Sequence, residues 1–329
     1  MGKVIASAIL AVLVLLVSLA SQLNLIDVKA VKASGEAAAV FRSTGGLWWF
    51  EQNGWPNEDD VSLDVALRVH GLFPLSVYEL CNYYNDGTVT RDIILTLIED
   101  AVDFDYATFF IFANGVNCTF YDVIYYVVGG IYGYPVYYIP VTHYQFYDTY
   151  DAPIRDFEIG EITRRQYEGS TIHFVFLWTC VQANEIGSYH YSYWIYYPYY
   201  FYQGTGAAGM PFAWTFRDYT QMSSDGYTSP DSGAYCFIGF EGFGIPMSEE
   251  IPDSGGKNYG EFVKKFYYYA LVEGYKINKA LDKASYDVFG VQSFSQTPLY
   301  TGYTRYLPGL GWWTGKMRVY GNGNNTLPH

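Results

Sequence analysis

Cys180 is the residue of this sequence with the clearest potential for chemistry, because it ends an apolar run that is typical of a buried strand. The run is HFVFLWTC, residues 173–180, and the polar stretch VQANE follows it directly. A thiol at a strand end can act as the nucleophile of an acyl transfer when a base or a positive group favours its thiolate. Cysteine is also among the most frequently buried residue types, so an inert core thiol or one half of a disulfide is the alternative.

The remaining cysteines do not suggest a metal site. They are Cys81, Cys118 and Cys236, all widely spaced, and no two of the four cysteines form a CxxC pair. This spacing excludes a zinc knuckle, and we expect neither a metal nor a cofactor. The even number of cysteines permits two disulfides if the protein is exported.

The elements around Cys180 alternate between amphipathic helices and apolar strands. Hydrophobic periodicity predicts helices at 62–73, 88–101, 259–274 and 276–289, the second of them capped by Thr90, and apolar strands at 106–115, 173–180 and 234–242. Such a pattern indicates an α/β fold with a mostly parallel central sheet that is covered on both faces. Functional groups gather at the carboxyl ends of such strands, so Cys180 should lie at the rim where ligands bind.

The order of these elements resembles that of the caspase-like cysteine peptidases, including the gingipain-like and CHAT-like branches. FFIFANG is a strand that ends in a small-residue-Gly turn, and HFVFLWTC is a second strand that ends in cysteine. IGFEG and the helical pair FVKKFYYYALVEGYKINKALDKASYDV follow, as in that family. The similarity spans about residues 60–290 and implies a caspase-like three-layer sandwich, with an aromatic β-rich insertion at about 116–170.

The resemblance implies that Cys180 is the nucleophile and that the Gly115 N–H donates to the oxyanion. Where the family has His-Gly, this chain has Asn114-Gly115. An asparagine cannot accept a proton at neutral pH and therefore cannot activate a thiol as histidine does. His143 is the best substitute base, because it follows a predicted strand within the insertion, and His190 is the second choice.

The other candidate residues have weaker support. His173 begins the cysteine strand and should lie at the opposite sheet edge, and the helical setting of His70 favours a packed or surface role. Four acidic residues that follow strands could form a pocket for a basic side chain, or they could be solvated loop residues: Glu185, Asp225, Asp231 and Glu241.

Composition excludes some classes of protein. The chain has 329 residues, a net charge of −14 and 36 tyrosines. Nucleic-acid binding requires basic surface, so we expect no nucleic-acid partner. With 50% apolar and 16% charged residues, the chain can bury a large core.

The N-terminus predicts export. Gly2 and Lys3 precede an uncharged apolar stretch at 4–20, which could be a cleaved signal peptide or a retained membrane anchor. We therefore expect a secreted or cell-surface protein. The predicted organisation is a leader at 1–20, a small-residue spacer at 21–45, the α/β domain at 46–300 and a Gly/aromatic-rich tail at 301–329.

Three functions fit these patterns. The first is an exported cysteine peptidase, with Cys180, His143 and Gly115 as catalytic groups and a peptide or protein substrate. The second is an inactive relative that binds a peptide, a glycan or a cell-surface partner, which the Asn114 replacement favours directly. The third is a structural protein of the cell envelope, whose acidic, tyrosine-rich surface mediates lateral packing.

Overall fold

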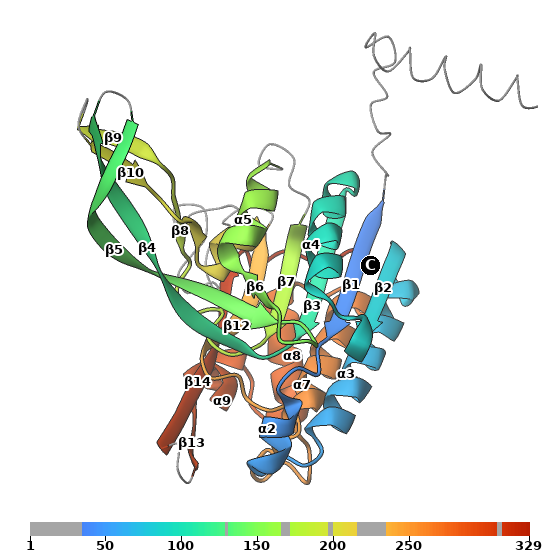
Figure 1. Cartoon of the computed structure of the whole chain (residues 1–329). Helices are drawn as coiled ribbons and strands as arrows, with labels where there is room; N and C mark the ends of the chain where they lie inside the picture. Colours follow the sequence, from blue (N-terminus) through green and yellow to red (C-terminus); the bar gives the residue numbers. More distant parts are fainter. Residues whose placement is uncertain (1–34, 129–130, 166–171, 197–199, 216–234, 308–310) are drawn as a thin grey trace, which may run out of the picture. The chain divides into compact units, whose positions relative to one another are not determined.

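A mostly parallel seven-stranded sheet organises the chain in the computed structural model (Figure 1). The structure describes residues 35–128, 131–165, 172–196, 200–215, 235–307 and 311–329. The strand order is β13-β14-β12-β7-β3-β1-β2, in which β12, β7, β3, β1 and β2 run parallel and β14 runs antiparallel to both of its neighbours, β12 and β13. The strands are β1 (Glu36–Arg42), β2 (Tyr78–Asn85), β3 (Tyr106–Phe112), β7 (Ile172–Trp178), β12 (Cys236–Gly242), β13 (Tyr303–Leu307) and β14 (Gly311–Gly321).

Helices cover both faces of this sheet, as the sequence pattern predicted. One face packs against α3 (Glu58–Leu72), α7 (Tyr259–Tyr267) and α8 (Ile277–Phe289), and the opposite face packs against α4 (Arg91–Asp100), α5 (Asp156–Arg165) and α6 (Met210–Thr215). Shorter helices are α2 (Leu47–Gln52) and α9 (Pro298–Thr301). The mixed α/β class and the mostly parallel sheet are therefore confirmed.

Local sequence explains several helix ends. The side chain of Thr90 accepts a hydrogen bond from the Ile93 N–H at 3.3 Å and caps α4, as expected. Asn258 caps α7 in the same way through the Glu261 N–H, and α7 continues into a π-helical turn at 268–272. Gly290 ends α8 at a φ of 72°, a left-handed conformation that glycine adopts without a Cβ clash.

The insertion forms an antiparallel sheet of its own, with the order β6-β5-β4-β10-β9. Its strands are β4 (Gly115–Val128), β5 (Ile131–Tyr147), β6 (Pro153–Arg155), β9 (Tyr193–Tyr196) and β10 (Tyr200–Gln203). Two short strands, β8 (Ser188–His190) and β11 (Gly206–Ala208), pair antiparallel with each other. In the sequence, β8 precedes β9 and β11 follows β10. The expected aromatic β-rich insertion is thus observed, and it recruits β9 and β10 from beyond residue 170.

Two predicted boundaries of the domain were wrong. Residues 36–42, which we expected in the spacer, form β1 between β3 and β2. The segment EAAAVFR combines small residues that fit between two strands with Val40 and Phe41, which are completely buried. The predicted tail contributes β13 and β14, and Met317 and Val319 of β14 belong to the core. Residues 21–34 of the expected spacer and the leader at 1–20 lie outside the described residues.

Within the part of the chain that the structure describes, no helix is both long enough and apolar enough to cross a membrane.

Candidate functional site

The ends of β3 and β7 bring together three of the predicted site residues. The two strands pair in parallel, with Phe112 opposite Trp178. Asn114 and Gly115 follow the end of β3, and Cys180 follows the end of β7, so all three lie at the same sheet edge. The expectation that the cysteine is delivered to the carboxyl rim is therefore confirmed.

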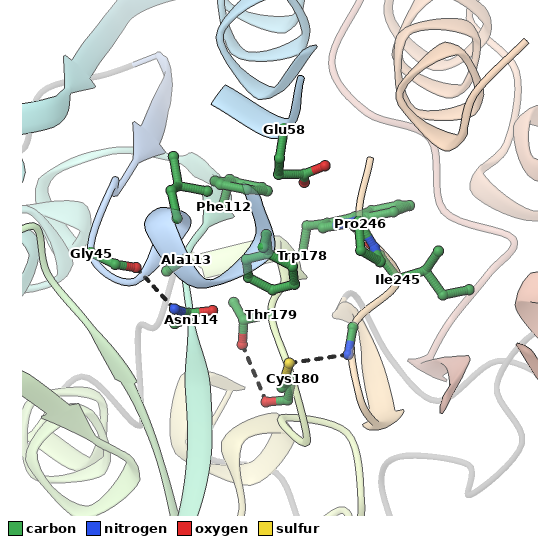
Figure 2. Close-up of a pocket in the computed structure, with 13 residues that line it drawn as sticks. Gly45, Glu58, Phe112, Ala113, Asn114, Trp178, Thr179, Cys180, Ile245 and Pro246 are labelled. Carbon is green, nitrogen blue, oxygen red and sulfur yellow. Dashed lines mark hydrogen bonds between the residues drawn. The ribbon is translucent and has the colours of Figure 1, made fainter. Parts of the chain in front are cut away.

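Cys180 is held by backbone donors. Its side chain is 8% exposed, and the Gly244 N–H donates to Sγ at 3.2 Å (Figure 2). Burial raises the pKa of the Cys180 thiol to about 11, although hydrogen bonds from the N–H groups of Gly244, Gly115 and Cys180 itself lower it. Because burial dominates, the thiol is protonated at neutral pH and is a poor nucleophile.

Asn114 follows β3, where the resemblance implied a histidine, and its side-chain amide is a hydrogen-bond donor. Its amide Nδ2 donates to the carbonyl oxygen of Gly45 at 3.0 Å, and Figure 2 shows this nitrogen turned toward Gly45. This hydrogen bond ties the end of β3 to the loop before α2.

Gly115 lies where no side chain would fit. A Cβ at this position would be 2.5 Å from Gln182 Nε2, 2.7 Å from the Cys180 carbonyl oxygen and 2.8 Å from Thr179 Oγ1. The absence of a Cβ lets the backbone of β4 approach the strand end that carries Cys180. The Gly115 N–H also lowers the pKa of the Cys180 thiol, whereas the resemblance implied that it donates to an oxyanion.

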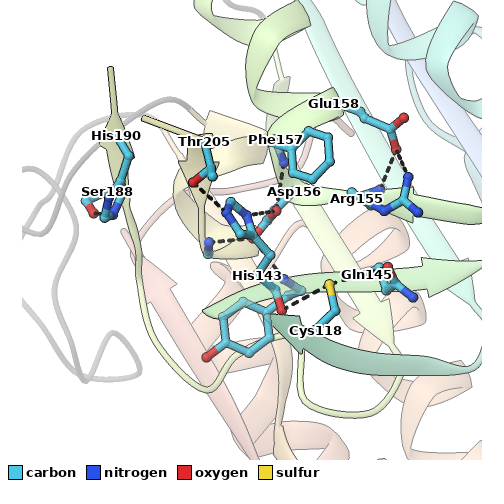
Figure 3. Close-up of polar contacts among 12 residues, drawn as sticks. Cys118, His143, Gln145, Arg155, Asp156, Phe157, Glu158, Ser188, His190 and Thr205 are labelled. Carbon is cyan, nitrogen blue, oxygen red and sulfur yellow. Dashed lines mark hydrogen bonds and ion pairs between the residues drawn. The ribbon is translucent and has the colours of Figure 1, made fainter. Parts of the chain in front are cut away.

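The predicted pair of Cys180 and His143 is not formed. His143 is completely buried, with Nδ1 2.7 Å from Asp156 Oδ1 and Nε2 2.9 Å from Thr205 Oγ1 (Figure 3). Both ring nitrogens are therefore engaged, and neither contacts the thiol. The physical reason is the register of the insertion: β5 pairs His143 with Cys118, and its ring turns toward the first residue of α5.

The second choice, His190, has its ring nitrogens 2.9 Å from Asp122 Oδ2 and 3.2 Å from Ser188 Oγ, so it does not contact the thiol either. His173 stacks on Tyr106 at the start of β7, away from Cys180 as expected. The His70 ring packs against Tyr83 in a tilted arrangement with centroids 5.3 Å apart, which fits the packed alternative of the packed or surface role that its helical setting indicated.

Two of the four acidic residues proposed for a pocket lie in the described part of the chain: neither Glu185 nor Glu241 lines the pocket beside Cys180, and Glu241 lines a separate surface pocket. Glu185 accepts a hydrogen bond from the Tyr144 hydroxyl at 3.1 Å. Glu241 pairs with Arg318 at 2.7 Å and with Lys316 at 3.4 Å. Asp225 and Asp231 lie outside the described residues.

Glu58 is a buried carboxyl beside the same sheet edge. It lines a narrow cavity together with Cys180 (Figure 2) and accepts hydrogen bonds from the N–H groups of Met247 and Ser248 at 2.9 and 2.8 Å. Burial raises the pKa of Glu58, against these hydrogen bonds, which lower it. Its partners identify it as the residue that ties the start of α3 to the loop after β12.

A surface pocket of about 470 Å³ opens beside Cys180, and aromatic rings form much of its wall. Trp49, Phe243 and Trp313 lie close together, with ring centroids 4.8 Å apart for Trp49 and Trp313 and 4.7 Å for Phe243 and Trp313. Asp151 also lines the pocket, and it makes no ion pair within the described ranges of the chain. A planar or cationic group fits such a wall better than an aliphatic one does.

The sequence did not predict this pocket. Its residues come from α2, β4, β14 and the loops that follow β5 and β12. They are up to 264 positions apart in the sequence, so only the fold brings them together. The one available signal was the Trp48-Trp49-Phe50 cluster, since large aromatic residues near a strand-end rim are typical of binding surfaces.

The cysteines are all free, so the disulfides that the even count permitted are not formed. Cys236 begins β12 opposite Phe174, at the other end of the sheet from Cys180. The described residues contain no cluster of three or more histidine, cysteine, aspartate or glutamate side chains suited to a metal ion.

Comparison with known proteins adds no identity to these observations. No protein-family model matches the chain, and no curated protein is significantly similar to it.

Proposed function

We propose that this protein is a non-catalytic relative of the caspase-like cysteine peptidases that binds an exposed basic side chain of a peptide or protein at the cell surface. One observation carries the proposal. Cys180 lies at the floor of an aromatic pocket at the strand ends, with Asn114 in place of the family base and only backbone N–H groups against its sulfur.

The adjacency of the two strand ends supports the resemblance. The family pattern requires the small-residue-Gly turn and the cysteine to follow neighbouring strands, and β3 and β7 are neighbours in parallel register. Gly115 lies against the strand end that carries Cys180, so its N–H is near the place where the resemblance implied an oxyanion donor. The binding partner is met outside the cytoplasm if the apolar stretch at 4–20 acts as an export signal, as its sequence predicts.

The state of the thiol argues against catalysis. With a pKa of about 11, roughly one Cys180 side chain in 10⁴ is a thiolate at pH 7. A working cysteine peptidase requires a base or a cation that favours the thiolate, and both ring nitrogens of His143 and of His190 are engaged by other residues. The site therefore has a pocket for a ligand but no group that would convert the thiol to a nucleophilic thiolate.

The chemistry of the pocket favours a cationic ligand group. Tryptophan faces attract guanidinium and ammonium groups, and the Asp151 carboxylate supplies the opposite charge. The same aromatic cluster already accommodates one guanidinium, since Arg305 lies over the Trp55 ring at 4.4 Å and Trp55 contacts Trp313. An arginine or lysine side chain of a peptide is therefore the ligand class that we expect.

A binding experiment tests this function. Fluorescence anisotropy would compare two labelled five-residue peptides with glycine on both sides of a central arginine or a central glutamine. We expect the arginine peptide to bind, and Asp151→Asn to weaken its affinity by about fivefold, the size of one exposed charge pair. Asp253→Asn is the matched control, because Asp253 is also exposed and also has a positive φ, of 60° against 61° for Asp151. Equal binding of the two peptides would contradict the proposal.

The aromatic wall has its own test. Trp49→Ala should weaken binding of the arginine peptide by about tenfold, because it removes one face of the expected cation–π contact. Trp48→Ala is the control, since the adjacent Trp48 is 61% exposed and is not part of the pocket wall. Equal losses in the two variants would show that the pocket is not the binding site.

A structural role at the cell surface is the second candidate, and the insertion favours it. Its outer half exposes a row of tyrosines, among them Tyr132, Tyr134, Tyr137 and Tyr138. Lateral packing through this surface would appear in sedimentation velocity as an assembly that grows with protein concentration and disappears when Tyr134 and Tyr138 are replaced by lysine.

A further inference from the structure

A second group of chemically competent residues lies in the insertion, apart from the strand-end pocket. Ser188 Oγ lies 3.2 Å from His190 Nε2, and His190 Nδ1 lies 2.9 Å from Asp122 Oδ2. Figure 3 shows Ser188 and His190 together on one strand. This order of hydroxyl, imidazole and carboxylate is the arrangement that activates a serine for acyl transfer.

The carboxylate of this group is built to stay ionised. Asp122 is completely buried, and its oxygens accept hydrogen bonds from the Tyr202 hydroxyl, His190 Nδ1 and, at 2.8 Å, the Thr205 N–H. Burial alone would raise the pKa of Asp122, but these hydrogen bonds outweigh it and hold this pKa below its usual value. An ionised Asp122 keeps the proton of the imidazole on Nδ1, which leaves Nε2 free to accept the proton of Ser188.

The hydroxyl and the imidazole can be reached from solvent. Ser188 is exposed, and the His190 side chain is 29% exposed. The two residues are separated by one position on β8, so they lie on the same face of the strand. A substrate carbonyl can therefore approach Ser188 Oγ without any movement of the core.

A neighbouring cluster provides an internal comparison. Thr205, His143 and Asp156 repeat the same connectivity, at 2.9 and 2.7 Å, but His143 and Asp156 are completely buried. Asp156 is also committed to the N–H groups of Tyr144 and Gly209, so this cluster holds β5, α5 and the start of α6 together. Of the two hydroxyl–imidazole–carboxylate clusters, the one that contains Ser188 is accessible to solvent.

We propose that Ser188, His190 and Asp122 form a serine esterase site, distinct from the Cys180 pocket. Ser188 is the nucleophile, His190 is the general base and then the general acid, and Asp122 orients the imidazole. The substrate class is a small uncharged ester.

The reaction balances with water as the only co-reactant. Ser188 Oγ bonds to the ester carbonyl carbon while its proton passes to His190 Nε2, and collapse of the adduct breaks the bond to the alkoxy oxygen. The leaving alcohol takes the proton from His190, which leaves an acyl-serine. Water then attacks the acyl carbon and gives a proton to His190. The bond to Ser188 Oγ breaks, Oγ recovers the proton, and a carboxylic acid is released.

The surroundings of Ser188 favour an uncharged substrate. From Tyr189 to Gln203 the chain contains no aspartate, glutamate, lysine or arginine. Tyr191 and Tyr193 are exposed beside β8, and Tyr191 stacks on Tyr189 at 5.9 Å. Flat aromatic surface of this kind suits an aryl or short acyl ester, and the Arg164 guanidinium lies 5.9 Å from the centroid of the Tyr189 ring at its edge.

The test uses the full chain in a Cys180→Ala background, so that the Cys180 thiol contributes no acyl transfer. Hydrolysis of p-nitrophenyl acetate and labelling by an uncharged fluorophosphonate are followed, and the labelled residue is located by mass spectrometry. We expect label on Ser188, and we expect Ser188→Ala to lower the hydrolysis rate by about 100-fold. Ser192→Ala is the matched control, an exposed serine four positions further along the chain whose loss should leave both readouts unchanged.

His190→Gln separates the chemistry from simple exposure of a hydroxyl. Glutamine can still donate to Asp122 but cannot accept and return a proton, so we expect the same loss of hydrolysis with an unchanged melting temperature. Label that is absent, or equal in the Ser188→Ala and Ser192→Ala variants, would overturn the proposal. A hydrolysis rate that His190→Gln leaves unchanged would overturn it equally.

Discussion

At the residue scale, the Cys180 site shows how one position changes the chemistry of a strand end. Gly115, Gly244 and Cys180 direct N–H groups at a sulfur that burial keeps protonated. Such donors stabilise negative charge, yet nothing at this site removes the proton. Under the proposed function, Asn114 in place of a base accounts for binding without catalysis.

Restoring an imidazole at position 114 should activate the thiol. In the native protein we expect alkylation of Cys180 by iodoacetamide to rise about tenfold for each pH unit between pH 7 and 9 without a plateau, because the pKa is about 11. Asn114→His should raise the rate at pH 7 by about tenfold or more, since an adjacent imidazolium lowers a thiol pKa. Mass spectrometry of the Cys180 peptide measures both rates.

Val116→His is the control for this experiment, because Val116 is 40% exposed on the wall of the same pocket. An equal gain in both histidine variants would show that proximity of charge, rather than the family position, controls the thiol. A plateau below pH 8.5 in the native protein would mean an activated thiolate and would favour the peptidase over the inactive relative.

Gly115 should tolerate no side chain. Gly115→Ala places a methyl group 2.5 to 2.8 Å from three atoms of the chain, so we expect a loss of about 1–3 kcal/mol in the free energy of unfolding, as for other overpacked sites. Gly71→Ala in α3 is the control: its Cβ meets nothing within 4 Å, and alanine in a helix should stabilise by about 0.5–1 kcal/mol. Urea unfolding curves compare the two variants, and equal midpoints would contradict the close approach at Gly115.

At the scale of elements, two buried carboxylates hold the insertion in place. Asp156 begins α5, accepts from the N–H groups of Phe157, Tyr144 and Gly209, and lies 2.7 Å from His143. Asp122 joins β4 to β8, β10 and the loop before β11 through its three donors. These elements are far apart in the sequence, so each carboxylate connects segments that no local contact would hold together.

Asp122 should make stability depend on acid pH. Its pKa is lowered in the folded state, so its contribution is complete above the unfolded value of about 3.9 and is lost as pH falls through the folded value. At pH 7, Asp122→Asn should lower the free energy of unfolding by about 1–3 kcal/mol, because the buried donors lose a charged acceptor. Its melting temperature should therefore be lower than that of the native protein. Below pH 4 the native protein should approach the variant.

Thermal melts between pH 3 and 7 measure this difference, with Asp253→Asn as the control at an exposed loop position. A gap between the native protein and Asp122→Asn that stays constant over this pH range would refute the assignment of a charged tie to Asp122.

Three strands of the main sheet, β3, β7 and β12, were predictable from local patterns, and the partners of the histidines were not. Strands such as β3 and β7 are unbroken apolar runs, and the α4 stripe has helical spacing, so each is readable from a few neighbouring residues. The direction of His143 depends instead on the register of β5 against β4 and on Asp156 thirteen positions later. β1 was missed because its alanines carry little hydrophobic signal until β2 and β3 enclose them.

At the scale of the whole molecule, the outer part of the insertion is separate from the core. Across the described residues, neither hydrophobic cluster includes a residue between 115 and 143, whereas Tyr144, Phe146 and Ile154 at the base of the insertion belong to one of them. Figure 1 shows β4, β5, β9 and β10 continuing beyond the helices that cover the sheet. Between Thr119 and Thr142 the one charged residue is Asp122, so the acidity of the chain is carried elsewhere. The molecule thus combines an acidic α/β domain with an aromatic extension that has a single charged residue.

This separation predicts independent opening of the extension. Amides at 123–128 and 131–139 are held by pairing with each other and with β10. The side chains of 131–139 are largely exposed and those of 123–128 are mostly half-buried, whereas β3 and β7 are buried on both faces. Local opening therefore requires less free energy in the extension than in the sheet, by about 3 kcal/mol or more. Hydrogen–deuterium exchange with mass spectrometry should show exchange at 123–139 well before exchange at 106–112 and 172–178.

Asp122→Asn should accelerate exchange in the first range and leave the other two unchanged, because the carboxylate ties only the insertion. Simultaneous exchange of all three ranges would mean that the extension and the sheet unfold as one cooperative unit, and the aromatic surface would then be as rigid as the domain that carries it.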